Sequence, residues 1–137
     1  MILVTRGIIV QNGRVLAAQR PETMSLPLLW ELPGGKVEPE ELIEDCVVRE
    51  TFEELMLHVC VVERLPHVDR EFKGKQYRMV PFVCEVLGGK LRVVEHAQAV
   101  WQPMDQLFEL EWAPAEELLM RQFVALRLQA LALEQAL

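Results

Sequence analysis

Residues 32–57 read LPGGKVEPEELIEDCVVRETFEELML, a glycine-containing turn followed by a segment with a helical period. The run Pro33-Gly34-Gly35 predicts a loop, because glycine lets the backbone approach a ligand closely and expose its amide or carbonyl groups. Residues 39–55 predict a helix, since Pro39 suits a first helical turn and the acidic residues that follow favour the N-terminal half. The stretch is therefore a loop joined directly to a helix.

Three carboxylates lie on one face of this predicted helix. Glu50, Glu53 and Glu54 stand at i, i+3 and i+4, and such like charges repel by a few tenths of a kcal/mol per exposed pair. A divalent cation removes this repulsion, and Mg²⁺ prefers a few carboxylates with water and substrate phosphate completing its octahedron. A solvated acidic helix face is the alternative interpretation. The adjacent glycine loop and Lys36, a cation suited to a terminal phosphate, favour a site.

The rest of the chain alternates strands and helices and carries no repeat or linker. Asn12-Gly13 predicts a type I′ turn between two strands, and Pro81 predicts a bulge or an edge position in its strand. The pattern predicts an α/β (α+β) fold with a mixed β-sheet between helices. The expected strands are 2–10, 14–20, 30–32, 59–65, 76–87, 91–94 and 97–101, with one helical turn at 104–107 and a long helix at 114–133.

Composition excludes several classes of protein. The 137 residues fit one domain, 1–137, and the apolar runs are far shorter than the roughly 20 residues of a membrane span. The N-terminus lacks the features of a signal peptide, so a cytoplasmic location is expected. The net charge of −7 argues against stable nucleic-acid binding. Three scattered cysteines indicate reduced core thiols and no zinc site.

The charged positions of this stretch resemble a known family signature. Gly35, Glu41, Arg49-Glu50 and Glu53-Glu54 have the spacing of the Nudix box, GX5EX7REUXEEXGU, where U is a bulky aliphatic residue. The segments AAQRP (17–21), WELPGGKVEPEE (30–41), EHAQAVW (95–101) and APAEELL (113–119) resemble the MutT branch, and most closely its CTP pyrophosphohydrolase and 8-oxo-dGTP types. The resemblance implies the α/β/α sandwich of that family.

Two positions depart from the box. Thr51 replaces an aliphatic residue of similar size, so we expect a small effect on packing. Met56 replaces the glycine that normally follows the helix in a left-handed conformation, which costs a non-glycine residue roughly 1 kcal/mol. Either Met56 accepts this strain or the helix ends differently. No expected metal ligand is lost.

The resemblance implies a role for each residue of the box. Glu50, Glu53 and Glu54 would bind Mg²⁺, with Mn²⁺ as an alternative ion, and the Gly34 carbonyl would be a further ligand. Arg49 would orient the glutamates, and Glu41 would support the loop and helix. Glu53 is the first candidate for the general base and Glu95 the second. Glu95 is expected at the metal site or, alternatively, as an ordinary loop acid.

The substrate contacts are implied by the same resemblance. Arg20 and Lys36 are expected at the phosphates, although Arg20 also fits a strand-end surface residue. Glu116 takes the position of a base-reading Asn or Asp, and as an acceptor it favours a base edge that presents N–H donors. A solvent-facing acid at the helix start is the alternative. Together with Leu32, Arg20 and Glu116 are expected to decide the substrate.

Three functions are compatible with the sequence. The first is a pyrophosphohydrolase that cleaves oxidised, modified or surplus (d)NTPs to monophosphate and pyrophosphate. The second keeps the chemistry but acts on another nucleoside diphosphate-linked substrate, such as a dinucleoside polyphosphate or a nucleotide sugar. The third is a non-catalytic nucleotide-binding module, against which the complete set of box glutamates argues. The expected partner is a small nucleotide, and the expected state is a monomer or a homodimer.

Overall fold

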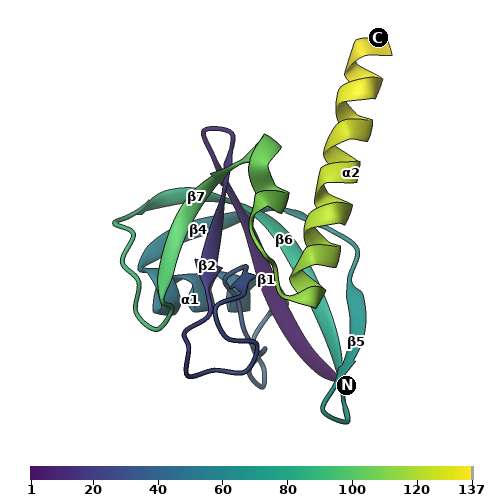
Figure 1. The fold of residues 1–137 in the computed structure, drawn as a ribbon. Coiled ribbons are helices and arrows are strands. Elements are labelled where there is room, and N and C mark those ends of the chain that lie inside the picture. Colours follow the sequence, from purple (N-terminus) through teal and green to yellow (C-terminus); the bar gives the residue numbers. More distant parts are fainter. Residues whose placement is uncertain (137) are drawn as a thin grey trace.

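A computed structural model describes residues 1–136 and shows a curved β-sheet with helices on both sides (Figure 1). A single 3-10 helix, η1, links the last strand to the long C-terminal helix. The elements are β1 (Ile2–Gln11), β2 (Arg14–Gln19), β3 (Trp30–Glu31), α1 (Ile43–Leu55), β4 (Leu57–Arg64), β5 (Val68–Phe72), β6 (Lys75–Gly89), β7 (Gln98–Pro103), η1 (Met104–Glu109) and α2 (Pro114–Ala136).

The sheet is mixed, as the sequence predicted. Its central order is β3-β2-β1-β6-β4, with β5 also pairing with β6 and β7 also pairing with β2. β1 and β6 run parallel over eight residue pairs, from Ile2 opposite Tyr77 to Ile9 opposite Cys84. All other strand pairs are antiparallel, and Asn12 and Gly13 form the tight turn between β1 and β2.

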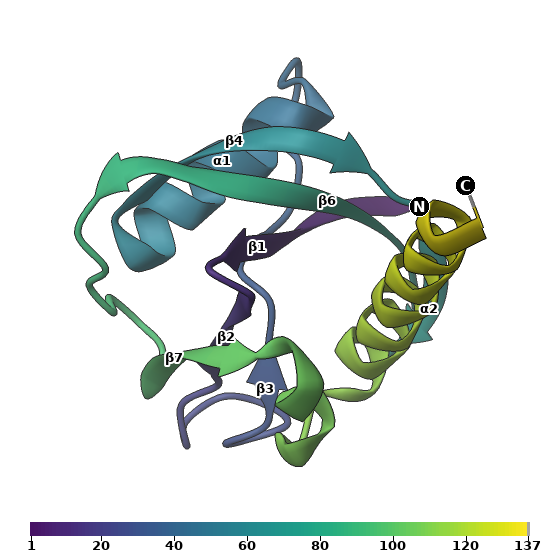
Figure 2. The ribbon, with the colours of Figure 1, turned by 90° about the horizontal axis from the view of Figure 1, so that it is seen from above.

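Alternate residues of β1 build two separate cores. Ile8 packs with Leu119 and Phe123 of α2, while Ile9, its neighbour, packs with Val47 and Leu55 of α1. This is the period-2 alternation of a strand that is covered on both faces. Figure 2 shows α1 and α2 on opposite sides of the central strands. The predicted layering of a mixed sheet between helices is therefore confirmed.

The first helix begins later than the sequence predicted. Residues 39–40 form a turn, and α1 starts at Ile43 with Leu42 as its N-cap residue. The cause is Glu40, whose φ of 66° is incompatible with a right-handed helix. The prediction of a helix from Pro39 was wrong. Proline only favours the first turn of a helix, and here the conformation of the loop overrides that preference.

Two further expectations on strands are corrected. Residues 91–94 form no strand; they cross the end of α1, where the Arg92 N–H donates to the Leu55 carbonyl over 2.9 Å. Residues 68–72, which were not expected to be a strand, form β5, an edge of the sheet beside β6. The conformation of both segments is set by residues far away in the sequence, so a local sequence pattern does not predict it.

Pro81 lies inside the central strand β6, not at an edge. Its carbonyl accepts from the Leu65 N–H over 3.0 Å, at the point where the antiparallel partner of β6 changes from β4 to β5. The backbone N and O atoms of one strand residue point toward the same neighbouring strand. The N–H that Pro81 lacks would therefore point to the gap between β4 and β5, where β6 has no ladder partner to lose. The ladder with β1 on the other side is left complete.

The end of α1 resolves the question of Met56. The residue adopts the left-handed conformation, with φ 60° and ψ 23°, and its N–H donates to the Phe52 carbonyl over 2.9 Å. The helix therefore ends in the way that it would with glycine at this position, and Met56 accepts the strain of the left-handed conformation.

Replacing Met56 by glycine is expected to raise the free energy of unfolding by about 1 kcal/mol, because the left-handed strain disappears while the cap hydrogen bond stays. Chemical denaturation of wild type and Met56→Gly measures this change. Leu55→Gly, one residue earlier in the helix, is the matched control and is expected to destabilise. A Met56→Gly protein that is less stable than wild type contradicts the assignment of strain.

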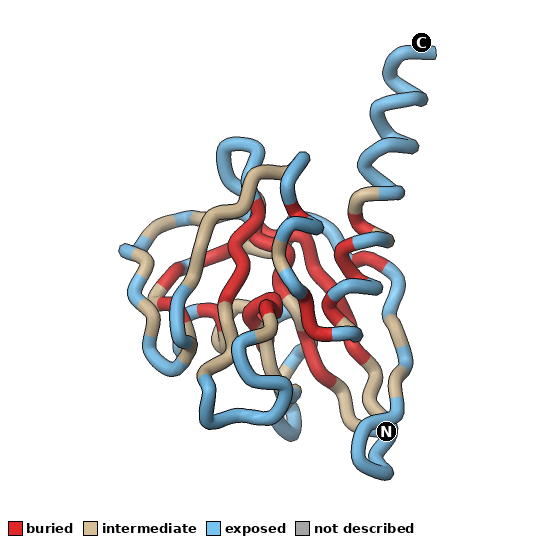
Figure 3. The backbone as a smooth tube through the Cα atoms, viewed as in Figure 1, coloured by how far each residue is buried: buried red, intermediate tan, exposed pale blue. Residues whose placement is uncertain are grey.

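The last helix packs into the core only along its first half. Leu119 and Phe123 are buried, but Leu118 and Leu126 are exposed, and α2 continues beyond the body of the protein (Figure 3). No helix within residues 1–136 has both the length and the apolar character needed to cross a membrane.

Candidate active site

The glycine loop is held against β1 by backbone hydrogen bonds. The Thr5 N–H donates to the Gly35 carbonyl over 2.8 Å, and the Gly7 N–H donates to the Pro33 carbonyl over 2.7 Å. Gly34 lies between them with φ +149°, and a Cβ there would lie 2.0 Å from the Thr5 carbonyl oxygen. Only glycine fits this position. Among the described residues, no backbone N–H from outside the loop donates to the Gly34 carbonyl, so that oxygen is left for another partner.

Arg49 gathers the carboxylates at the start of the acidic helix face. Its guanidinium makes a bidentate pair with Glu41, with Nε–Oε2 at 2.6 Å and Nη2–Oε1 at 3.0 Å, and its Nη1 reaches Glu50 at 3.0 Å and Glu53 at 3.1 Å. The hydrogen bonds from Arg49 lower the pKa of Glu41 to about 2. Glu41 also accepts from the Glu38 N–H over 3.0 Å, so it ties the loop to the helix. Arg49 therefore positions both the loop and two predicted metal ligands.

Glu50 and Glu54 already lie at the glycine loop. The Glu50 carboxylate packs on Gly35, where a Cβ would come within 2.5 Å of its carboxyl carbon. Glu54 Oε2 accepts from the Gly34 N–H over 2.9 Å. Burial raises the pKa of Glu54 to about 7, against the opposing effect of that N–H. A carboxylate that is buried without a cation is destabilised in its charged form, so this position favours a positive ligand.

The raised pKa makes a prediction about stability without metal. The free energy of unfolding of the metal-free protein is expected to fall as pH rises from about 4.5 through about 7, because the unfolded carboxyl releases its proton first. The part due to Glu54 is about 3 kcal/mol, at about 1.4 kcal/mol per pKa unit. Denaturation curves between pH 4 and pH 8 for wild type and Glu54→Gln measure it as their difference.

Saturating Mg²⁺ at pH 8 is expected to restore stability to the wild type and not to Glu54→Gln. Glu44→Gln, an exposed residue of the same helix, is the control. Equal pH slopes in wild type and Glu54→Gln contradict the role given to this carboxyl.

The segment before β7 closes the same end of α1. The Val94 N–H donates to the backbone carbonyl of Glu54 over 3.1 Å, which holds the loop that carries Glu95 beside the acidic face. Glu95 itself is exposed. The backbone contact brings the residue before Glu95 to the last turn of α1, and the role of Glu95 at the metal site stays a prediction.

One pocket of about 600 Å³ joins Glu54 to the other predicted contacts, while Glu50, Glu53 and Glu95 are not among the residues that line it. It contains Glu54 and the glycine loop, the predicted phosphate contacts Arg20 and Lys36, and Glu116 from the start of α2. The hairpin of β5 and β6 lines the opposite wall. Leu32 is not among the lining residues: it is only 1% exposed and packs in the core with Ile8 and Leu119. Its expected contact with the substrate is replaced by a packing role.

Glu116 is buried, with 3% of its surface exposed, so the interpretation as a solvent-facing acid was wrong. The Nε of Arg6, from the middle of β1, donates to Glu116 Oε1. Burial raises the pKa of Glu116, and the charge of Arg6 opposes this effect. The pocket thus offers a donor and an acceptor side by side. Sequence reasoning missed Arg6, although a charged residue inside the apolar strand ILVTRGIIV was the signal.

Arg20 is held at the pocket by a second buried pair. Its Nη1 donates to Glu31 Oε2 over 2.9 Å, and its Nε donates to the Ser25 carbonyl over 2.7 Å. Glu31 is 8% exposed, and its other oxygen lies 3.0 Å from His96 Nε2. Both Glu31 and His96 were missed by sequence reasoning, since they come together only when β3 and the loop before β7 meet.

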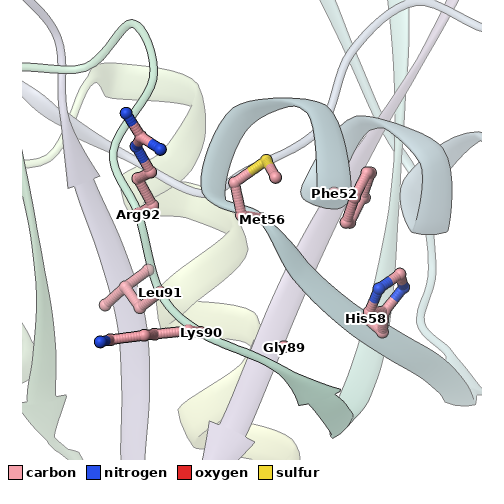
Figure 4. A pocket seen from close by; sticks show the side chains of 7 residues that line it. All are labelled: Phe52, Met56, His58, Gly89, Lys90, Leu91 and Arg92. Atoms are coloured by element: carbon pink, nitrogen blue, oxygen red, sulfur yellow. The ribbon is translucent and has the colours of Figure 1, made fainter.

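A second hollow lies beside the end of α1 (Figure 4). Phe52 and His58 stack there with ring centroids 4.5 Å apart, and the head groups of Lys90 and Arg92 point away from them. No carboxylate lines this hollow, so it lacks the ligands of a divalent cation. The pocket that contains Glu54 is therefore the candidate active site.

The fit of a metal ion can be tested against the arrangement of these side chains. Within residues 1–136, no three His, Cys, Asp or Glu side chains converge closely enough to hold an ion. The carboxylates have other partners: Arg49 donates to Glu50 and Glu53, and Glu54 accepts from the Gly34 N–H. The donors are carboxylates beside a free backbone carbonyl, which is the oxygen chemistry that Mg²⁺ prefers. Of the two carboxylates that Arg49 holds, Glu53 has the more exposed side chain, 55% against 19% for Glu50.

Comparison with known proteins identifies the family of this chain. The NUDIX domain model matches residues 1–125. CTP pyrophosphohydrolase of Escherichia coli is 36% identical over 127 residues, covering 93% of this chain and 94% of the relative. Putative 8-oxo-dGTP diphosphatase 2 of Mycobacterium tuberculosis is 35% identical over 121 residues, covering 83% of this chain and 82% of the relative.

Solved structures show the same fold. The solution structure of the Escherichia coli ORF135 protein has a TM-score of 0.81 at 36% identity and covers 93% of this chain and 91% of that one. The MutT Nudix hydrolase from Burkholderia pseudomallei has a TM-score of 0.76 at 28% identity and covers 88% and 96%. The chain belongs to the Nudix family and is a MutT-like member of it. It is a hydrolase of pyrophosphate-containing nucleotide substrates, in a family that generally uses divalent metal ions.

Proposed function

We propose that the protein hydrolyses nucleoside triphosphates, including oxidised, modified or surplus (d)NTPs, to the monophosphate and pyrophosphate in a Mg²⁺-dependent reaction. The observation that carries the proposal is the pocket that contains Glu54 and the glycine loop together with the Arg6–Glu116 pair. A substrate with a polyanionic part and a hydrogen-bonding base matches these two groups of residues. The relatives named for CTP and 8-oxo-dGTP agree with a triphosphate substrate.

On the acidic helix face, Glu50, Glu53, Glu54 and the Gly34 carbonyl would hold the metal. A bound Mg²⁺ would neutralise the phosphates and activate a water that attacks one phosphorus of the α–β anhydride; the P–O bond of that anhydride breaks, and the monophosphate and pyrophosphate leave. Glu53 would accept the proton of the water, with Glu95 as the alternative base. Arg49 keeps Glu50 and Glu53 on the loop side of the helix. Arg20, fixed by Glu31, and Lys36 bind the phosphate oxygens.

Within the pocket, Glu116 selects the base. Its carboxylate accepts from an amino or imino N–H of the base, while Arg6 donates to a carbonyl or a ring nitrogen. Because only 4% of the Glu116 side chain and 15% of the Arg6 side chain are exposed, a base that leaves their remaining polar atoms without a partner is disfavoured. Bases with an acceptor beside an exocyclic amine are therefore the favoured class.

A screen of pyrophosphate release tests the proposal. Canonical, oxidised and methylated (d)NTPs are assayed with Mg²⁺, together with dinucleoside polyphosphates and nucleotide sugars. Pyrophosphate and monophosphate from a triphosphate support it. Release of inorganic phosphate alone, or turnover only of the linked diphosphates, contradicts it. Nucleotide binding without turnover across all substrates and metals indicates a non-catalytic module.

A further inference from the structure

His96, from the loop before β7, is a buried polar side chain, with only 5% of its surface exposed. Its Nε2 lies 3.0 Å from Glu31 Oε1, and because a carboxylate oxygen only accepts, Nε2 is the donor. The other ring nitrogen, Nδ1, is buried and has no hydrogen-bond partner among residues 1–136. The hydrogen bond that accounts for this buried ring is therefore the one to Glu31.

Glu31 links His96 to Arg20, with one carboxylate oxygen for each. Its Oε2 accepts from Arg20 Nη1 over 2.9 Å, and its side chain is 10% exposed. Burial raises the pKa of Glu31, but the hydrogen bond from His96 and the charges of the two nearby arginines outweigh this effect and keep the pKa below its usual value. The carboxylate is therefore charged at neutral pH, and each of its buried oxygens needs a donor.

Arg20 is only partly occupied by its partners in the protein. Its Nη1 donates to Glu31, its Nε to the Ser25 carbonyl over 2.7 Å, and its Nη2 to Ser25 Oγ over 3.1 Å. A guanidinium has five N–H donors in one plane, so the described residues leave two of them for a ligand. Arg20 lines the candidate active site, and its pairs with Glu31 and Ser25 fix the direction of these two donors.

We propose that His96 is a positioning residue that acts through Glu31 to keep Arg20 available for substrate phosphate. This role rests on the proposed function, which assigns Arg20 to the phosphates. Without the His96 donor, Glu31 Oε1 has no partner, and the carboxylate can turn to pair with Arg20 through both oxygens. Such bidentate pairs are the favoured geometry of arginine and carboxylate, and this one would take an N–H group that otherwise binds phosphate.

Equilibrium binding of imidodiphosphate, a pyrophosphate analogue that resists hydrolysis, tests the proposal in the presence of Mg²⁺. By isothermal titration calorimetry, His96→Ala is expected to raise the Kd about tenfold, as for the loss of one charge-assisted hydrogen bond. In the Arg20→Ala background the same substitution is expected to change the Kd by about twofold or less, because the residue through which it acts is gone. His96→Gln keeps an N–H donor at a similar reach and is expected to restore most of the affinity. Thermal denaturation checks that each variant is folded.

Gln98→Ala is the matched control. Gln98 lies two residues after His96, and its Nε2 donates to Gln19 Oε1 over 2.8 Å at the surface, so its loss is expected to leave the Kd unchanged. The proposal is overturned by a wild type that does not bind imidodiphosphate, or by a His96→Ala protein with the wild-type Kd. Equal effects of His96→Ala with and without Arg20 also overturn it, as does a His96→Gln protein as weak as His96→Ala.

The binding cycle and the screen of pyrophosphate release have separate outcomes. A chain that fails the screen loses the proposed triphosphate substrate, whereas the binding cycle still decides whether His96 acts through Arg20. A chain that passes the screen but shows independent effects of His96 and Arg20 keeps its function and loses the positioning role.

Discussion

Replacement of Glu53 by glutamine is expected to lower kcat for pyrophosphate release by 10²–10⁴-fold, the usual contribution of a positioned general base. Glu53 is the most exposed of the three residues, with its side chain 55% exposed and a hydrogen bond from Arg49 at 3.1 Å. Glu54, in contrast, is turned to the Gly34 N–H. Steady-state kinetics at saturating Mg²⁺ measures the loss.

Comparison with Glu95→Gln separates the two candidate bases. If Glu53 takes the proton, Glu53→Gln loses activity at all pH values, and Glu95→Gln mainly raises the Mg²⁺ concentration needed for half-maximal rate. The reverse pattern assigns the base to Glu95. Glu44→Gln, on the exposed side of α1, is expected to keep wild-type kinetics and serves as the control. Full activity of Glu53→Gln would show that Glu53 is not the general base.

Replacement of Gly34 by alanine is expected to destabilise the protein by more than about 3 kcal/mol, beyond the common range for single substitutions. The added Cβ would lie 2.0 Å from the Thr5 carbonyl oxygen and 2.9 Å from the Arg6 Cα, and neither backbone can yield without disturbing the pairing of β1 and β6. The positive φ of +149° adds strain. Thermal denaturation is expected to show a lowered Tm or a protein that does not accumulate folded.

The neighbouring substitution is the matched comparison. At Gly35 the added Cβ meets only the Glu50 carboxylate, the far end of a flexible side chain. Gly35→Ala is therefore expected to fold with nearly wild-type stability but to need more Mg²⁺, since a predicted metal ligand is displaced. A Gly34→Ala protein as stable as Gly35→Ala contradicts the steric account of the loop.

Much of the candidate site lies within one continuous stretch, and local rules suffice for it. The spacing of Glu50, Glu53 and Glu54 on a helix follows from 3.6 residues per turn, whatever surrounds that helix. The two layers around the sheet follow from the alternation in β1. The start of α1 did not follow, because the left-handed Glu40 is set by how the loop docks on β1.

The parts beyond local prediction are those in which distant residues meet. Arg6 and Glu116 are 110 positions apart, and only the packing of α2 against β1 makes them a pair. Glu31 and His96 are 65 positions apart and meet through the return of β7 to β2. Leu32 is the opposite case: it is next to the glycine loop in the sequence, but its side chain packs in the core and not at the pocket.

The sequence by itself determined the family signature, the mixed sheet between helices and the acidic helix face, since each rests on spacing along a short segment. Only the tertiary structure decided that Met56 carries left-handed strain, that Glu54 is buried beside Gly34, and that Glu116 faces Arg6 instead of solvent. The physical reason is that burial, and with it the charge state and partners of a side chain, depends on elements far apart in the chain. The spacing of residues along a short segment does not show which distant elements will pack against it.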